Sequence, residues 1–132
     1  LYAVGVQEQD AGLVIWSWDL EGALRWVTSW DGGGTERSRT IEIDPVDGSL
    51  LVAANAGDSA RDLDLVMLRV DPASGEITDE HRWETSGDEE IHDLVVDGDS
   101  GYLVGQTTTW GEGSHDALVV KFGMRPWSFP EE

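Results

Sequence analysis

Short apolar runs separated by polar turns dominate the chain. Residues 13–18 (LVIWSW) and 65–70 (LVMLRV) are apolar with little alternation, a pattern typical of strands covered on both faces. Turn-forming Asp, Gly, Ser and Pro lie between runs, as in residues 44–49 (DPVDGS) and 97–101 (DGDSG), and they supply the hydrogen bonds and positive φ angles of hairpins. No room remains between the turns for a helix of useful length. The pattern therefore predicts an all-β chain of short antiparallel strands.

The same runs recur at a fixed spacing. Residues 13–19 (LVIWSWD) match residues 65–71 (LVMLRVD), which match residues 117–123 (ALVVKFG), and each step is 52 residues without a gap. Three further sets of matches surround these runs. They are residues 2–5, 50–53 and 102–105 at spacings of 48 and 52, residues 40–44 and 93–97 at 53, and Trp30 with Trp83 at 53. Each unit thus contains four short strands.

Four antiparallel strands that recur about every 50 residues predict the blade of a β-propeller, since one such sheet must pack against its neighbours. We expect an all-β chain, a β-propeller fragment of about 2.5 four-stranded antiparallel blades with a repeat of ~52 residues. A β-sandwich is the alternative fold. It explains the strands but not the constant period.

The order of the strands divides the chain into four parts. With strands named A to D from the propeller axis outward, residues 1–35 are a partial blade (B, C, D) and residues 36–86 a complete blade. Residues 87–123 are a partial blade (A, B, C), and residues 124–132 are a tail whose prolines predict that it does not pair as a regular strand. Because soluble proteins avoid unpaired edges, we expect the C-terminal part of a longer propeller, partnered by the remaining blades or by copies of itself.

The charge of the chain excludes some classes of binding partner. The chain has 27 Asp and Glu against 8 Lys and Arg, a net charge of −19, which repels phosphate backbones and anionic lipid. Nucleic acid is therefore not an expected partner. No apolar run approaches the roughly 20 residues that span a bilayer, so membrane insertion is not expected. The absence of cysteine excludes disulfides and thiolate metal sites.

Residues 91–122 contain the clearest copy of the unit. An Ile/Val-rich strand ends in Asp97, a glycine turn follows, and the strands YLVG and DALVVKF come next. Residues 22–26 (GALRW) and the glycines at 32–34 extend the pattern, whereas the second unit has Asp79 where Trp26 aligns and keeps only one of those glycines, Gly87. These segments resemble the bacterial SBBP-type β-propeller repeat over most of the chain. The resemblance implies a secreted or cell-envelope bacterial protein and no particular activity.

Two aspartates suggest a cation site. Asp97 and Asp99 have an Asp-x-Asp-x-Gly spacing that offers hard oxygen ligands to calcium. The segment lacks the sixth-position glycine and the later glutamate of an EF-hand, and it falls where the repeat requires a hairpin turn. A structural turn is the alternative, and no other cofactor is expected. The histidines lie at unrelated repeat positions without metal-binding spacing: His81, His92 and His115.

Tryptophan is the unusual resource of this chain. Four tryptophans lie on repeated strand positions, where packing between blades or in the core is expected: Trp16, Trp18, Trp30 and Trp83. Trp110 lies outside the apolar runs, in a polar loop that also contains Thr108 and Thr109. An exposed indole flanked by hydroxyls stacks on a sugar ring or anchors a protein partner. These three residues are the candidate ligand-binding site.

Catalytic signatures are absent from the sequence. No nucleophile elbow, phosphate-binding loop or dinucleotide fingerprint occurs, so no catalytic residue is assigned. Asp64 and Asp116 occupy equivalent positions before strand C, which predicts a shared structural role in binding a neighbouring turn. Glu89 and Glu90 form an acidic pair that is expected to face solvent.

The leading hypothesis for function is a non-enzymatic binding or scaffolding module, part of a larger or oligomeric extracellular propeller that recognises a protein or a glycan. The alternative is the C-terminal part of a propeller enzyme, a hydrolase or lyase with carboxylates at the central channel. A third hypothesis is an architectural spacer in a surface protein. Propellers serve many unrelated functions, so fold alone does not separate these.

Overall fold

The computed structural model describes residues 1–7, 12–59 and 62–131. Within these ranges the chain forms strands and turns without a helix, and eleven strands make three antiparallel sheets of three, four and four strands. The prediction of an all-β chain of antiparallel strands is confirmed. Over the same ranges there is accordingly no helix with the length and apolarity to cross a membrane.

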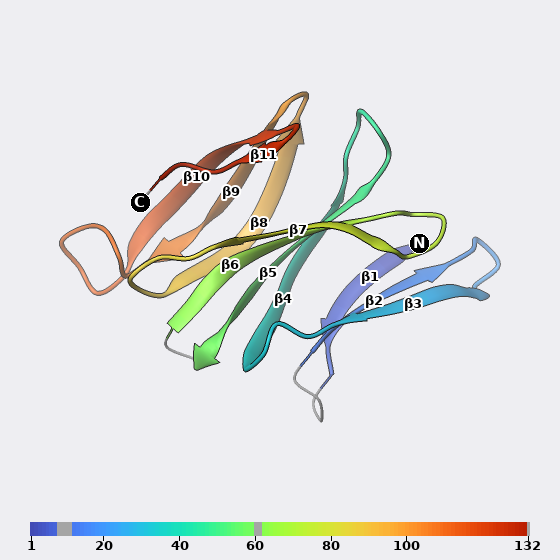
Figure 1. Cartoon of the computed structure of the whole chain (residues 1–132), viewed down its shortest axis with the longest axis horizontal. Coiled ribbons are helices and arrows are strands. Elements are labelled where there is room, and N and C mark those ends of the chain that lie inside the picture. Colours follow the sequence, from blue (N-terminus) through green and yellow to red (C-terminus); the bar gives the residue numbers. More distant parts are fainter. Residues whose placement is uncertain (8–11, 60–61, 132) are drawn as a thin grey trace.

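The sheets follow one another along the chain and stand side by side, with the second in the middle (Figure 1). Sheet 1 contains β1 (Tyr2–Val6), β2 (Leu13–Trp18) and β3 (Leu24–Trp30). Sheet 2 contains β4 (Thr35–Ile43), β5 (Leu50–Ser59), β6 (Asp62–Val70) and β7 (Ile77–Trp83). Sheet 3 contains β8 (Glu89–Asp97), β9 (Ser100–Thr107), β10 (Asp116–Met124) and β11 (Trp127–Ser128). In every sheet, strands that are consecutive in sequence are neighbours.

Aspartates and glycines form the hairpin turns, as their sequence predicts. The Asp71 carboxylate accepts a hydrogen bond from the Ala73 N–H at 2.7 Å, and Asp44 accepts one from the Val46 N–H at 2.9 Å. Gly75 closes the β6–β7 turn with φ +78, and a Cβ there would lie 2.6 Å from the Trp26 ring. The turn therefore requires glycine both for its backbone conformation and for its contact with sheet 1.

The pairing register shows which residues are equivalent between sheets. The equivalent cross-strand pairs are Tyr2 with Ser17, Leu51 with Arg69, and Tyr102 with Lys121. Leu51 therefore corresponds to Tyr2, and the expected match of residues 50–53 with residues 2–5 is wrong by one position. The difference matters because a shift of one residue moves each side chain to the opposite face of a strand.

Sheet 2 is covered on both faces. One face packs on sheet 1 through Val52, Val66, Leu68, Val70, Leu13 and Ile15. The opposite face packs on sheet 3 through Leu51, Leu65, Met67, Leu94, Leu103, Val120 and Phe122. Residues 65–68 are fully buried as a result, which explains why their run is apolar without alternation.

The tryptophans of the last strand in sheets 1 and 2 occupy one repeated position. Trp30 pairs with Leu13 and Trp83 pairs with Leu65, and both indoles belong to the core clusters. Their predicted core role is confirmed. Trp16 and Trp18 instead lie half-buried on the outer face of sheet 1, stacked with ring centroids 6.4 Å apart. Their packing between blades stays a prediction, because no described sheet lies over that face.

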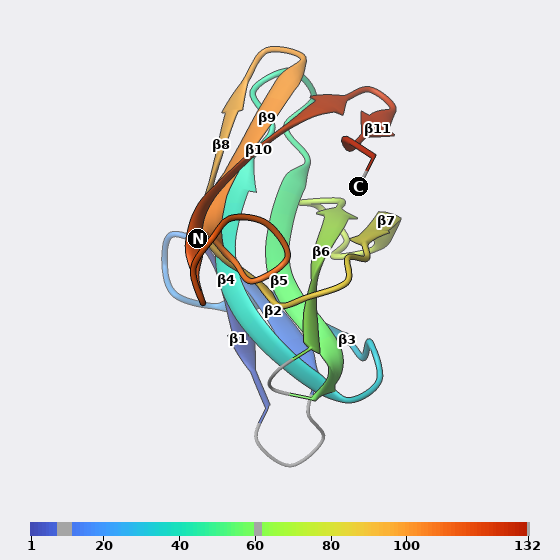
Figure 2. The same cartoon turned by 90° about the vertical axis from the view of Figure 1, so that its left-hand side faces the viewer.

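The tail contributes a strand, and the expectation that it does not pair is wrong. Met124 pairs with Trp127 and Gly123 with Ser128, so β11 occupies the fourth position of sheet 3. Pairing is possible because the prolines, at positions 126 and 130, lie on either side of the paired residues. The tail then returns toward β7 (Figure 2), where the Trp83 indole donates a hydrogen bond to the Pro130 carbonyl at 3.0 Å.

Candidate functional site

Trp110 lies in the loop between β9 and β10, which projects from one end of the molecule (Figure 1). Its ring stacks on Trp83 with centroids 5.5 Å apart and planes 21° apart. Trp83 is only 8% exposed and Trp110 is 37% exposed. The buried indole therefore supports one side of Trp110, while part of the ring remains open to solvent.

Thr108 and Thr109 connect this loop to the loop between β7 and β8. The Thr108 hydroxyl accepts a hydrogen bond from the Asp88 N–H at 2.8 Å. The backbone N–H of Thr108 donates one to the Asp88 carbonyl at 3.0 Å. The Thr109 hydroxyl donates to the Glu89 carboxylate and lies 3.3 Å from the Thr85 hydroxyl. Both threonines thus fix the backbone that carries Trp110, and Thr108 remains exposed.

Two aspartates fasten the ends of these loops. The Asp116 carboxylate accepts a hydrogen bond from the Gly113 N–H at 3.2 Å, and Asp64 accepts one from the Thr85 N–H at 3.3 Å. Both aspartates therefore bind a loop, as predicted, but the role is not the same in the two sheets: Asp116 binds the loop that precedes it, and Asp64 binds the loop that follows β7. Gly111, with φ +105, packs so closely on Asp116 that a Cβ would lie 2.0 Å from its Oδ2 atom.

A polar cluster lies on the first strands of sheets 2 and 3. Glu90 Oε1 accepts hydrogen bonds from Arg37 and, at 3.4 Å, from Arg39, while its Oε2 accepts one from Gln106 at 2.6 Å. Arg37 and Glu90 are 53 residues apart, which is the spacing of the repeat in these strands. The same position therefore carries opposite charges in neighbouring sheets, and the two side chains pair.

The acidic pair does not face solvent as expected. Glu89 has no exposed surface, and its Oε1 accepts hydrogen bonds from Thr107 at 2.7 Å and from Thr109. Its burial follows from the loops that fold over it, which the sequence pattern did not reveal. Glu36 is the equivalent residue of sheet 2, also 53 positions earlier, and is likewise buried. The recurrence of glutamate at this repeat position was the signal in the sequence that could have indicated a buried structural role.

Each of these two glutamates keeps one oxygen without a hydrogen-bond partner among the described residues, namely Oε2. Glu36 Oε1 accepts a hydrogen bond from the Gly32 N–H at 3.1 Å. Burial raises the pKa of Glu36, and the nearby Asp31 raises it further, although the Gly32 N–H and Arg82 act in the opposite direction. Glu36 therefore carries an electrostatic cost in its charged form.

Asn55 is a buried polar residue that sequence reasoning missed. Its Oδ1 accepts hydrogen bonds from the Ile91 N–H at 3.1 Å and from Arg39 Nε at 3.0 Å. Its Nδ2 donates to the Glu89 carbonyl and, at 3.3 Å, to the Asp64 carbonyl. The amide thus binds the backbone of β8 from sheet 2 and joins the two sheets at their inner strands.

The candidate calcium ligands lie at the opposite ends of these strands. Asp97 and Asp99 are exposed, and Asp99 Oδ1 lies 3.4 Å from Arg125 Nε. Among the residues that the structure describes, no three His, Asp or Glu side chains come together as a metal site. His81 stacks on Phe129 at 4.4 Å. Calcium binding at Asp97 and Asp99 stays a prediction.

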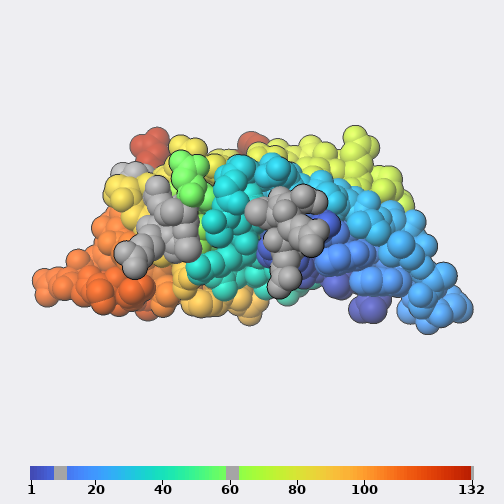
Figure 3. All heavy atoms as spheres, turned by 90° about the horizontal axis from the view of Figure 1, so that it is seen from below, coloured from blue at the N-terminus to red at the C-terminus, as the bar shows by residue number. Residues whose placement is uncertain are grey.

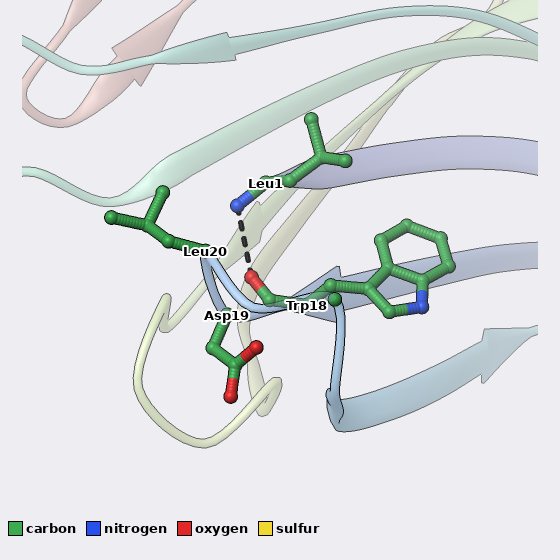
Figure 4. A pocket seen from close by; sticks show the side chains of 5 residues that line it. Leu1, Trp18, Asp19 and Leu20 are labelled. Atoms are coloured by element: carbon green, nitrogen blue, oxygen red, sulfur yellow. Dashed lines mark hydrogen bonds between the residues drawn. The ribbon is translucent and has the colours of Figure 1, made fainter.

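A shallow apolar pocket of about 450 Å³ lies at the edge of sheet 1. Leu1, Trp18 and Leu20 surround it, and the amino group of Leu1 donates a hydrogen bond to the Trp18 carbonyl at 2.9 Å (Figure 4). The Asp19 carboxylate is held by the Ala23 N–H at 2.7 Å. The pocket therefore offers apolar contact beside one carboxylate, and it belongs to the outer face of sheet 1.

The molecule thus belongs to the class of all-β proteins built from successive antiparallel sheets. No protein-family model matches the chain. No curated protein matches it either.

Proposed function

We propose that the three sheets are successive blades of a β-propeller of the type that the repeat resembles, in a secreted or envelope protein of a bacterium. The repeated contacts support this arrangement. The first strand of sheet 2, β4, neighbours both β1 and β8, so the early strands of the sheets gather at one edge. The Trp30 indole donates a hydrogen bond to the Glu80 carboxylate of the next sheet at 2.8 Å. The equivalent Trp83 indole donates one to the Pro130 carbonyl of the tail at 3.0 Å. Each sheet therefore packs on the next through the same repeat positions.

Within that scaffold we assign a binding role, with Trp110 as its centre and a glycan as its ligand. The observation that carries this assignment is the stacking of a partly exposed Trp110 on the buried Trp83. Because Trp83 already packs on one face of the Trp110 indole, this side chain loses little conformational freedom when a sugar ring stacks on its open face. The surrounding loop offers exposed hydroxyl, carboxylate and imidazole groups from Thr108, Glu112, Ser114 and His115.

The charge of the protein selects among glycans. With a net charge of −19 and Glu112 in the loop, the surface repels sialylated or sulfated chains at low salt. The expected ligand is therefore a neutral saccharide. A protein ligand would use the same indole as an anchor, and it is the competing outcome of the test below.

The enzyme alternative has weaker support. A hydrolytic pair needs two carboxylates free to face a substrate. Glu90 is occupied by Arg37, Arg39 and Gln106, and Glu89 binds the hydroxyls beneath the Trp110 loop. These bonds give both acids structural roles, which favours binding over catalysis.

The test uses an array of immobilised neutral and sialylated oligosaccharides, probed with the wild-type chain, with Trp110→Ala and with Val46→Ala. Val46 is 60% exposed in the turn between β4 and β5, so it is the control. We expect neutral glycans to be retained, with a loss of about tenfold or more in affinity for Trp110→Ala and no change for Val46→Ala. Wild-type protein that retains no glycan, or Trp110→Ala that binds normally, contradicts the assignment.

A further inference from the structure

The two outer faces of the three-sheet stack carry the same repeat positions as the two faces that sheet 2 buries. Sheet 1 turns outward the equivalents of the sheet 2 residues that pack on sheet 1, and sheet 3 turns outward the equivalents of those that pack on sheet 3. The two faces lie at opposite ends of an elongated molecule, with sheet 1 in blue and sheet 3 in orange (Figure 3). The three-sheet stack therefore presents two different outer faces, which correspond to the two sides of the buried contact between neighbouring sheets.

The outer face of sheet 1 is apolar. Trp16 and Trp18 take the positions of Leu68 and Val70 in the buried interface, and Leu24 takes that of Ile77. Leu24 is 56% exposed and Val27, which pairs with Trp16, is 47% exposed. The Leu1–Leu20 pocket continues this surface at its edge.

Acidic side chains are missing from the outward-facing strand positions of sheet 1. The residues at those positions are Ala3, Gly5, Val14, Trp16, Trp18, Leu24, Val27 and Ser29. The chain has 27 acidic residues, and these keep most of its surface hydrated. A face without acidic side chains therefore differs from the rest of the surface. A partner with acidic groups meets no like charge on these strands.

The outer face of sheet 3 is also exposed and partly apolar. Val119 takes the position of the buried Met67 and is 69% exposed, while Val104, its neighbour on β9, is 39% exposed. Val95 on β8 is 56% exposed beside Tyr102. Lys121 lies over the Tyr102 ring at 5.7 Å.

We propose that the outer face of sheet 3 in one copy of this chain docks on the outer face of sheet 1 in a second copy, head to tail. The proposal rests on the blade arrangement of the proposed function and is independent of glycan binding. It extends the packing already present between sheets 2 and 3 across a molecular boundary. Because the two faces differ, the contact is heterologous, and it produces an open chain of copies or a closed ring.

Side-chain size and charge support this pairing. Inside the molecule, Leu65 and Met67 of one face meet Leu118 and Val120 of the next sheet. Sheet 3 offers the smaller Ala117 and Val119 at the positions of Leu65 and Met67. Sheet 1 has Val14 and Trp16 at the positions of Leu118 and Val120, and Trp18 at the position of Phe122, which belongs to the same buried cluster. The two indoles are larger than the side chains whose positions they take and offset the smaller side chains of sheet 3, as close packing requires.

Lys121 and its equivalent in sheet 2, Arg69, each lie over an aromatic ring. Arg69, the equivalent of Lys121, lies 5.2 Å from the centre of the Trp127 ring across the interface between sheets 2 and 3. In the docked pair, Lys121 lies at the end of sheet 1 that carries Trp18, because Leu20 takes the position of Met124, whose carbonyl Arg69 binds at 3.3 Å. A cation on an aromatic face is attractive, and more so when it is desolvated.

The test is sedimentation velocity over a range of protein concentrations, with three variants that each place a lysine at an exposed valine. Val119→Lys blocks the sheet 3 face and Val27→Lys blocks the sheet 1 face. Val46→Lys is the matched control, since Val46 is 60% exposed in the β4–β5 turn and lies outside both faces. Salt at about 0.5 M screens the repulsion between the acidic copies.

We expect the wild type and Val46→Lys to form species heavier than the monomer. Each face variant alone should associate at least about tenfold more weakly. A mixture of Val119→Lys and Val27→Lys should form dimers and stop there, because each variant keeps the face that the other has lost. This outcome identifies a head-to-tail contact specifically.

A wild-type chain that stays monomeric at every concentration overturns the docking proposal, as do face variants that associate like the wild type. Failure of the mixture to form dimers, with each variant monomeric, overturns the head-to-tail pairing. The glycan array and near-ultraviolet circular dichroism are run on the same samples. A folded, glycan-binding monomer therefore rejects the docking alone, whereas loss of glycan binding with intact association rejects only the proposed ligand.

Discussion

The carboxylate of Asp44 joins three parts of the chain at the β4–β5 turn. It has no exposed surface. Its Oδ2 accepts hydrogen bonds from Arg69 at 3.0 Å and Arg125 at 2.8 Å, and its Oδ1 accepts one from Arg125 at 3.1 Å and one from the Val46 N–H at 2.9 Å. Arg125 begins the tail that forms β11, so this contact holds the tail against sheet 2.

The magnitudes of two substitutions follow from what each leaves behind. In Arg125→Ala, Asp44 keeps Arg69 and the Val46 N–H, so the buried carboxylate stays paired and the loss is about 1–2 kcal/mol. In Asp44→Ala, two guanidinium groups lose their shared acceptor. Arg69 is only 13% exposed and retains Ser49 at 2.6 Å, so we expect a larger loss of about 2–4 kcal/mol rather than complete unfolding.

Urea unfolding followed by tryptophan fluorescence measures both values, since seven tryptophans report on the sheets. The double variant completes a thermodynamic cycle, and we expect a coupling energy of about 1–2 kcal/mol between Asp44 and Arg125. Arg25→Ala is the control, because Arg25 is exposed and its contact with Ser17 is long, at 3.5 Å. A coupling energy near zero, or an Arg125→Ala loss no larger than that of the control, refutes the argument that Asp44 holds the tail.

Three other substitutions test separate contacts. Burial raises the pKa of Glu36, so its contribution to stability falls as pH rises; Glu36→Gln should stabilise the fold by about 1 kcal/mol at neutral pH in urea titrations, and the gain should vanish near pH 4. The hydrogen bond from Ser49 lowers the pKa of Asp47, so its stabilisation is present above the unfolded pKa and is lost on acidification. Asp47→Asn should therefore cost a few tenths of a kcal/mol at neutral pH, because the side chain is half-exposed, and match the wild type in acid. Asn55→Ala leaves the Ile91 N–H without its side-chain acceptor; a loss of about 2–3 kcal/mol and faster hydrogen exchange at Ile91 are expected, and unchanged exchange argues against the bridge.

The offset along the chain was sufficient to predict β1 to β10 and their order, because the sheets use the same sequence of hairpins, but it did not predict β11 in the tail. It was not sufficient for the register of β5. Leu50 and Leu51 are both apolar and both fully buried, so a strand covered on two faces carries no alternation that marks which residue faces which neighbour. The pairing of β5 with β6 in the structure shows that Leu51, and not Leu50, is the equivalent of Tyr2.

Contacts between distant segments account for the other differences. Trp110 was identified as a candidate from its polar surroundings, but its stacking on Trp83 joins residues 27 positions apart. The burial of Glu89 likewise depends on Thr107 and Thr109 from another strand and loop. Local composition reports neither contact, because both arise only after the hairpins have folded against each other.

Repeat equivalence also bears on the choice between scaffold and enzyme. Glu36 and Glu89 occupy the same position in successive sheets. Glu36 accepts a hydrogen bond from the Gly32 N–H in the loop before β4, and Glu89 accepts one from the Thr109 hydroxyl in the loop between β9 and β10. Arg37 and Glu90 share another position and pair with each other across the sheets. A catalytic site needs groups that differ in role and converge on one substrate, whereas these residues of sheets 2 and 3 bind loops or each other. The inner polar residues are therefore better explained as contacts that fix one sheet to the next, which agrees with the proposal that recognition takes place at the exposed indole of Trp110.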